Sequence, residues 1–154
     1  TRKPTQPDLI QRKLFSIGIH AYCSPDYIKR FGTPRTLDDL DSHRIIMLGD
    51  AQVPPHLQNR SWLIDAGRNG SGPREPFFKV NNILGVVRAC QQGLGIAAIP
   101  DYLVEEGSRL VQLFGETDSI AVDTYFVYPE ELKTAKKVQV FRDFLVSKAR
   151  QWKY

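Results

Sequence analysis

The sequence predicts one α/β domain with a mostly parallel sheet. Strand-like and helix-like segments alternate along the 154 residues, which is typical of α/β folds. The composition, 42% hydrophobic and 25% charged, is that of an ordinary globular protein, and it excludes disordered, collagen-like and coiled-coil classes. No apolar run reaches the roughly 18 residues that a membrane helix needs, so we expect no membrane partner.

The predicted strands are short apolar runs bounded by glycine, proline or polar residues. In the first of them, Phe15, Ile17 and Ile19 lie at alternate positions, as in a strand with one buried face. The predicted strands are 14–22, 44–48, 61–65, 77–81, 95–99, 110–114 and 120–128.

The predicted helices begin after residues that can cap them. A helix over 25–30 follows Ser24, whose hydroxyl can accept a backbone N–H, and Pro25 suits its first position. A second helix begins at Asn81 or Asn82. Further helical segments are expected at 36–40, 101–106 and 134–152, of which the last is the longest.

Charge is spread thinly along the chain. There are 21 Lys and Arg against 17 Asp and Glu, which gives a net charge of +4. The basic residues gather no more closely than in pairs such as Arg12–Lys13. Because a nucleic-acid-binding face usually carries a concentrated basic stripe, we expect this segment to carry no DNA-binding surface of its own.

The chemistry-bearing residues assemble no catalytic or metal site in the sequence. Cys23 and Cys90 are far apart and belong to no CxxC motif or Cys/His cluster, so neither zinc nor a disulfide framework is expected. A reducing compartment fits this cysteine usage best. The GxSxG motif of a nucleophilic serine is absent from the sequence. We therefore predict no catalytic residue, no metal and no cofactor.

Two strand-to-helix corners are candidate ligand contacts. One is Asn81–Asn82 and the other is Cys23–Ser24. The first N–H groups of a helix are free, and its dipole favours an anion or a polar oxygen there. Two such corners facing one cleft would hold a small carboxylate. The alternative is that both only cap their helices.

Three motifs, in register along nearly the whole chain, resemble the effector-binding domain of LysR-type transcriptional regulators. The first reads CSPDYI at 23–28, FGTPRTLDDL at 31–40 and HRII at 43–46, and it is similar to the family's ASPxYL, GxP, DL and H elements. The second is VNN at 80–82 followed by QGLGIAAIPDYL at 92–103, similar to a polar helix cap and GLGIAxxP. The third is YFVYP at 125–129 with the helix that follows.

The resemblance implies a periplasmic-binding-protein-like fold of type 2, with two α/β subdomains and an effector between them. Residues 1–22 and 123–154 would form part of the first regulatory subdomain. Residues 23–122 would form a complete, Rossmann-like second one. The family's winged helix-turn-helix, its linker helix and the opening half of its first subdomain have no counterpart here. We therefore expect an excerpt of a longer protein, with a truncated gene product as the alternative.

The resemblance also implies a function and a site. The chain would be the effector-sensing regulatory domain of a bacterial transcription factor, not an enzyme, and a small polar or anionic metabolite would modulate its DNA binding. DNA would be held only through the domain absent from this chain, in a cytoplasmic homodimer or homotetramer. The family's effector contacts map to Cys23, Ser24, Asn81, Asn82, Ile83 and, more weakly, Tyr128.

Two alternatives stay open. A solute-binding protein of a transporter would share this fold, and it would need an export signal, which is not visible in these residues. The second alternative is a redox-responsive regulator that senses through Cys90. Such sensing requires that the cysteine be an exposed thiolate of low pKa. Cys90 falls on the apolar face of the helix over 82–92, so the simpler interpretation is a small buried hydrophobe.

Overall fold

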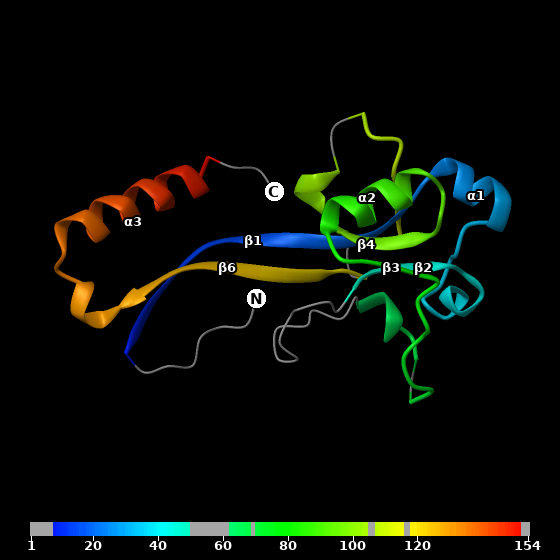
Figure 1. The fold of residues 1–154 in the computed structure, drawn as a ribbon, viewed down its shortest axis with the longest axis horizontal. Coiled ribbons are helices and arrows are strands. Elements are labelled where there is room, and N and C mark those ends of the chain that lie inside the picture. Colours follow the sequence, from blue (N-terminus) through cyan, green and yellow to red (C-terminus); the bar gives the residue numbers. More distant parts are fainter. Residues whose placement is uncertain (1–7, 50–61, 69, 105–106, 116–117, 152–154) are drawn as a thin grey trace. The chain divides into compact units, whose positions relative to one another are not determined.

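The computed structural model describes residues 8–49, 62–68, 70–104, 107–115 and 118–151 (Figure 1). The chain divides into two compact units. Unit 1 comprises Thr1–Ile17 and Ala121–Tyr154, and unit 2 comprises Gly18–Ile120. The predicted subdomain boundaries, after residues 22 and 122, fall slightly later in the chain.

Unit 2 is built on a mixed sheet. Its strands, in spatial order, are β3 (Phe78–Val80), β2 (Ile45–Leu48), β4 (Ile96–Pro100), β1 (Leu9–Cys23) and β5 (Val111–Leu113). β2 pairs in parallel with β3 and β4, whereas β1 is antiparallel to both β4 and β5. β1 begins in unit 1 and enters unit 2 where β4 ends, since Ile19 pairs with Pro100. The expectation of a mostly parallel sheet is therefore wrong for β1.

Two capped helices pack on the unit 2 sheet (Figure 1). Ser24 Oγ accepts the N–H of Tyr27 at the start of α1 (Pro25–Phe31). Asn82 Oδ1 accepts the N–H of Gly85, at 2.6 Å, at the start of α2 (Ile83–Gln91). Both caps agree with the sequence prediction, and both satisfy a backbone donor that the helix itself leaves without a partner.

The core of unit 2 lies on both faces of the sheet, because successive residues of a strand point to opposite faces. The cluster on the α2 face contains Tyr22, Ile46, Val86, Val87, Cys90, Ala97 and Ile99. The cluster on the opposite face contains Ala21, Cys23, Tyr27, Leu40, Ile45, Met47, Leu63, Ile64, Ile96 and Leu113. The sheet is therefore covered on both sides.

One predicted strand is a 3₁₀ helix. Residues 61–65 were expected to be extended, but Trp62–Ile64 form a helical turn, and residue 61 lies outside the described part. The N–H of Ala66 donates to the carbonyl of Trp62 at 2.9 Å. The N–H of Arg74 donates to the carbonyl of Ile64 at 2.8 Å. Leu63 and Ile64 are buried in the core, so this apolar run is satisfied without a strand partner.

Unit 1 contains the first part of β1, β6 (Ile120–Pro129) and α3 (Lys136–Ala149). β6 pairs with β1, and Asp123 on β6 accepts from Ser16 at 2.6 Å and pairs with Lys13 at 2.5 Å. Phe126 and Phe141 meet edge to face with ring centroids 5.7 Å apart, which places α3 against β6.

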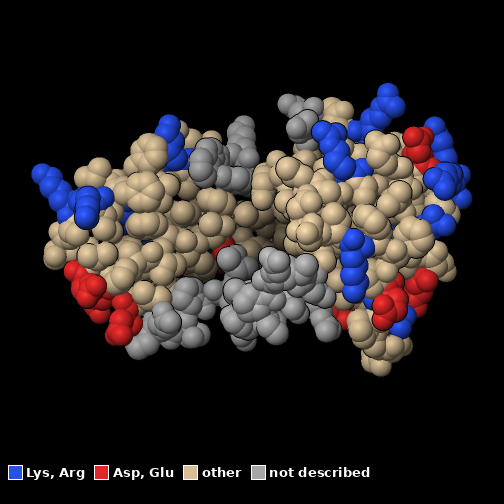
Figure 2. Space-filling model, viewed as in Figure 1, with Lys and Arg blue, Asp and Glu red and all other residues tan. Residues whose placement is uncertain are grey.

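The described surface carries mixed charge. On the face in Figure 2, lysine and arginine side chains are interspersed with aspartate and glutamate, and the described residues form no continuous basic strip there. No helix in the described ranges combines the length and the apolar character that crossing a membrane requires.

Candidate functional site

The carboxyl ends of three strands in unit 2 meet at one edge of the sheet. Leu48 pairs with Val80 at the ends of β2 and β3, and Gly49 continues this contact by donating its N–H to the carbonyl of Val80 at 2.7 Å. β4 is parallel to β2 and ends at Pro100. In open α/β sheets, ligands bind beyond this edge.

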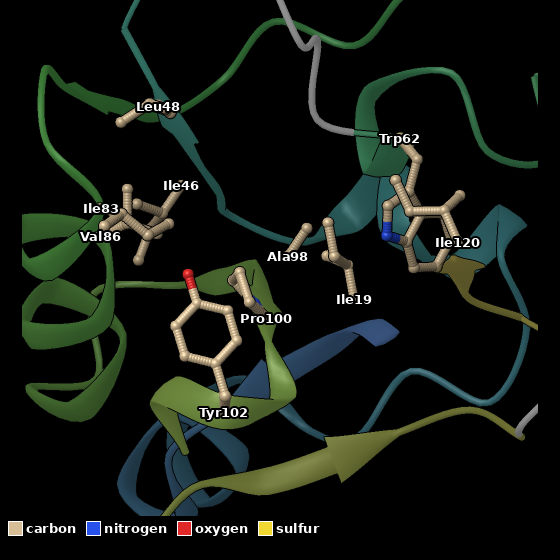
Figure 3. A pocket seen from close by; sticks show the side chains of 10 residues that line it. All are labelled: Ile19, Ile46, Leu48, Trp62, Ile83, Val86, Ala98, Pro100, Tyr102 and Ile120. Atoms are coloured by element: carbon tan, nitrogen blue, oxygen red, sulfur yellow. The ribbon is translucent and has the colours of Figure 1, made fainter. Parts of the chain in front are cut away.

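A pocket of about 260 Å³ lies at this edge, entirely within unit 2 (Figure 3). Ten residues from both faces of the sheet line it: Ile19, Ile46, Leu48, Trp62, Ile83, Val86, Ala98, Pro100, Tyr102 and Ile120. None of these carries a formal charge. The pocket therefore suits a small and mainly apolar group.

The Asn81–Asn82 corner adjoins this pocket. Ile83, the first residue of α2, lines the pocket, while Asn81 and Asn82 are exposed to solvent. The first N–H groups of α2 have no partner within the helix, and the helix dipole is positive at this end. A polar or anionic group at the corner would find hydrogen-bond donors and a favourable field.

The structure does not bring the two predicted corners together. Cys23 pairs with Val111 at the carboxyl end of β1, beyond Ile19, the residue of β1 that lines the pocket. Ser24 Oγ lies 3.3 Å from the position that a Cβ on Gly93 would occupy, and Gly93 lies beyond the last turn of α2. The corners are thus separated by about the length of α2, roughly 14 Å for nine residues. Of the two interpretations left open by the sequence, a cleft shared by both corners is therefore not formed within unit 2, because β1 runs antiparallel to β4.

Cys23 and Ser24 are enclosed by protein. The side chain of Cys23 is fully buried, and burial raises the pKa of its thiol to about 11. Ser24 is 2% exposed, and its hydroxyl caps α1. This geometry matches the alternative in which the corner only caps a helix.

Cys90 is also enclosed. It lies on the buried face of α2, and its Sγ donates to the carbonyl of Tyr22 at 3.2 Å. Burial raises the pKa of the thiol to about 12. A thiol in these surroundings forms little thiolate, and the thiolate is the form that oxidants attack.

Tyr128 belongs to the other unit. It is 7% exposed on β6 and lines a cavity of about 410 Å³ within unit 1, together with Arg12, Arg142 and Asp143. Among the described residues, no three His, Cys, Asp or Glu side chains come close enough to hold a metal ion.

Several pocket residues were not singled out by the sequence. Trp62 was assigned to a strand, and Tyr102 appeared only within the family motif at 92–103. In the structure both line the pocket. The motif itself was the available signal, because it ends on the turn that carries Pro100 and Tyr102.

Comparison with known proteins identifies the family. The profile of the LysR substrate binding domain matches residues 1–150. The chain belongs to the LysR substrate-binding domain family. This confirms the resemblance found in the three sequence motifs.

The relatives of this LysR domain are transcriptional regulators, not enzymes. The HTH-type transcriptional regulator CrgA of Neisseria meningitidis serogroup C is 26% identical over 139 residues, which is 88% of this chain and 45% of that protein. The regulator YhjC of Escherichia coli K12 is 28% identical over 154 residues, covering 94% of this chain and 48% of that protein. The chain thus spans about half the length of these relatives.

Solved structures show the same fold. The CrgA regulatory domain matches with a TM-score of 0.73 at 24% identity, covering 96% of this chain and 72% of that domain. The regulatory domain of AphB from Vibrio vulnificus matches with a TM-score of 0.66 at 22% identity, covering 95% and 71%. LysR regulatory domains have the periplasmic-binding-protein type 2 fold, which confirms the predicted fold class. LysR regulators bind DNA through a separate domain.

Proposed function

We propose that this LysR domain is the effector-sensing part of a transcription factor, and that the pocket at the ends of β2, β3 and β4 receives a small metabolite. The observation that carries the proposal is the position of the pocket: it lies at the strand ends where α/β sheets bind ligands, beside the N-terminus of α2. A polar or anionic end of the metabolite would contact Asn81 and Asn82, and its remainder would contact Ile83.

The proposed output is a change in DNA binding. Units 1 and 2 would correspond to the two regulatory subdomains, and DNA would be held by a separate domain in a cytoplasmic homodimer or homotetramer. A ligand shifts such an equilibrium only as far as it binds one arrangement better than the other. The effector would therefore favour one arrangement of subdomains or subunits and so alter how DNA is held.

This proposal keeps only some of the effector-contact residues that the sequence predicts. Asn81, Asn82 and Ile83 are retained because they adjoin the pocket. Cys23 and Ser24 lie at the carboxyl end of β1, do not line the pocket and are buried, and Tyr128 lines a cavity of unit 1.

The test is a thermal-shift screen of small metabolites on the full-length protein, followed by DNA binding with each compound that stabilises it. A ligand that binds the folded state raises the melting temperature. Asn82→Asp is the informative variant, because its carboxylate still accepts the Gly85 N–H as a cap but replaces an amide donor with a negative charge. We expect it to lose both the thermal shift and the DNA response to an anionic or acceptor-bearing compound.

Ser24→Ala is the matched control, since it removes the cap of α1, which lies near the C-terminal end of α2 and away from the pocket. It should lower stability by about 1 kcal/mol and keep the response. A compound whose shift survives Asn82→Asp would remove the corner from the site. Stabilisation with no effect on DNA binding would favour a solute-binding protein, and turnover of the compound would favour an enzyme.

A further inference from the structure

The indole N–H of Trp62 is a buried donor at the pocket wall. Nε1 is shielded from solvent, and within the described part of the chain no acceptor lies within hydrogen-bond distance of it. Trp62 lines the pocket, and Figure 3 shows the nitrogen on the edge of the ring that faces Ile19 and Ala98, two other lining residues. The donor therefore lies on the side of the ring toward these lining residues, and solvent does not reach it in this structure.

Local structure explains how the donor is held in this position. Trp62 begins the 3₁₀ helix, and its carbonyl accepts the N–H groups of Asp65 and Ala66 at 3.1 and 2.9 Å. Its ring packs against the core cluster that contains Leu63 and Ile64. The carbonyl of Trp62 and its ring are thus both held by described residues. A buried donor without an acceptor is unfavourable, so an acceptor brought by a ligand gains more here than it would at an exposed indole.

The other residues that line the pocket restrict which ligands can supply a hydrogen-bond acceptor to Trp62. Its other side chains are aliphatic, apart from Tyr102, which is about half exposed. A charged group placed among them without a partner would lose its hydration. The volume of about 260 Å³ exceeds the roughly 150 Å³ that holds a benzene molecule, so one ring with a small substituent fits.

We propose that the pocket binds an uncharged, mainly apolar group, of the size of one substituted ring, which carries a hydrogen-bond acceptor such as a carbonyl oxygen, and that Trp62 Nε1–H donates to this acceptor. Trp62 is then a specificity-determining residue. This inference rests on the proposed function, because it takes the pocket to be the effector site. Any charged end of the effector stays outside the pocket, toward the exposed Asn81–Asn82 corner.

The test compares two probes of nearly equal shape, acetophenone and α-methylstyrene, on the full-length protein. They differ in a carbonyl oxygen against a methylene group. We expect acetophenone to bind about three- to tenfold more tightly, which is the usual net effect of one neutral hydrogen bond. In ¹⁵N-tryptophan-labelled protein, acetophenone should move the Trp62 indole N–H resonance downfield and α-methylstyrene should not. Equal affinities, or an unmoved resonance at saturation, would overturn the inference.

Two variants test whether the preference for acetophenone arises at Trp62 in this pocket. Trp62→Phe keeps an aromatic ring but removes the donor, so it should abolish the preference for acetophenone and leave α-methylstyrene binding within about twofold. Ala98→Leu fills the pocket and should weaken both probes at least tenfold. A preference for acetophenone that persists in folded Trp62→Phe would overturn the role of Trp62.

The two proposals fail in different ways. Selective acetophenone binding through Trp62 with no change in DNA binding for any ligand of the pocket would uphold the pocket chemistry and overturn the proposed function. A DNA response that is equal for the two probes would uphold the proposed function and overturn the part assigned to Trp62.

Discussion

His20 Nδ1 lies 2.7 Å from Asp101 Oδ1, and the Tyr22 hydroxyl donates to the same oxygen at 3.0 Å. Because a carboxylate only accepts hydrogen bonds, the Nδ1 position of His20 carries the proton in this contact. Asp101 follows Pro100, the last residue of β4. The turn that brings Pro100 and Tyr102 to the pocket is therefore tied to β1 by side chains as well as by the backbone ladder.

Gly18 makes room for this carboxylate. A Cβ at residue 18 would overlap Asp101 Oδ2, and two hydrogen bonds restrain Asp101 from moving away. We expect Gly18→Ala to destabilise the protein by about 1–3 kcal/mol, the usual effect of inserting a methyl group into a packed site. Urea unfolding measures it.

The control for Gly18→Ala is the same substitution in an Asp101→Ala background. The overlap involves only the Asp101 side chain, so the alanine should then be nearly neutral, and the double-mutant cycle should show a coupling energy of at least about 1 kcal/mol. An equal effect of Gly18→Ala in both backgrounds would contradict the steric explanation.

Arg74 supports the 3₁₀ helix that carries Trp62. Its guanidinium, 7% exposed as a residue, donates to the carbonyls of Leu63, Ala66 and Leu37 and to Asp41. Arg74→Ala removes the guanidinium donor from the carbonyls of Leu63 and Ala66, while Leu37 O keeps the N–H of Leu40, and we expect a loss of about 3 kcal/mol in the free energy of unfolding. Lysine should rescue little, because an ammonium group cannot reproduce the planar fork.

Arg68→Ala is the control for Arg74, because Arg68 pairs with the same Asp41 carboxylate at 2.8 Å and its two carbonyl contacts, to Ser71 and Gly72, are exposed, so water can replace them. We expect a loss of less than about 1 kcal/mol, as is usual for surface ion pairs. Similar losses for the two variants would contradict the assignment of the Arg74 effect to its buried carbonyl partners.

The local chemistry of the sequence was enough to predict the helices and their caps. Asn82 and Ser24 cap helices as expected because an N-cap depends on a few adjacent residues. The 3₁₀ helix at Trp62–Ile64 was missed, since three apolar residues in a row bury equally well in a strand or in a helical turn. Short apolar runs do not distinguish the two.

The pocket could not be predicted in the same way. Whether two strand-to-helix corners share an edge depends on strand direction, and nothing near Cys23 specifies that β1 is antiparallel to β4. The pocket gathers residues as far apart as Ile19 and Ile120. The family motifs indicated which fold brings such segments together, and the buried donor of Trp62 required coordinates.

His43 makes stability depend on pH. Its Nδ1 lies 3.0 Å from the Tyr27 hydroxyl, which accepts the N–H of Arg44 at 2.9 Å. The hydroxyl therefore donates its one proton to a neutral imidazole. Burial lowers the pKa of His43 below its usual value, and the nearby Asp39 opposes this shift only in part.

The sign of the pH effect follows from proton uptake. The unfolded chain binds a proton at His43 more readily than the folded chain, so this part of the stability is complete above about pH 7 and is lost as the pH falls through the lowered pKa. We expect the urea midpoint to fall between pH 7 and 5.5. It should fall less in His43→Asn, whose amide oxygen accepts from Tyr27 without titrating. Parallel pH profiles for the two proteins would exclude His43 as the cause.

The two cysteines provide the last prediction. Burial raises the thiol pKa to about 11 for Cys23 and about 12 for Cys90, and both side chains are 0% exposed. Near pH 8, a rise in thiol pKa from about 9 to about 12 lowers the thiolate fraction roughly a thousandfold. By the same arithmetic a rise to about 11 lowers it roughly a hundredfold, so we expect iodoacetamide to label Cys90 at least a thousandfold and Cys23 at least a hundredfold more slowly in the folded protein than in guanidinium chloride, as followed by mass spectrometry.

Cys23→Ser isolates Cys90 in this experiment. Cys90 Sγ donates to the Tyr22 carbonyl and so connects α2 to β1, which means that a reagent reaches it only after α2 separates from the sheet. Labelling should then follow unfolding, and it should slow further when a pocket ligand stabilises the fold. Rapid labelling or peroxide oxidation of Cys90 in the folded variant would instead support a redox-sensing regulator, because it would show that α2 opens without global unfolding.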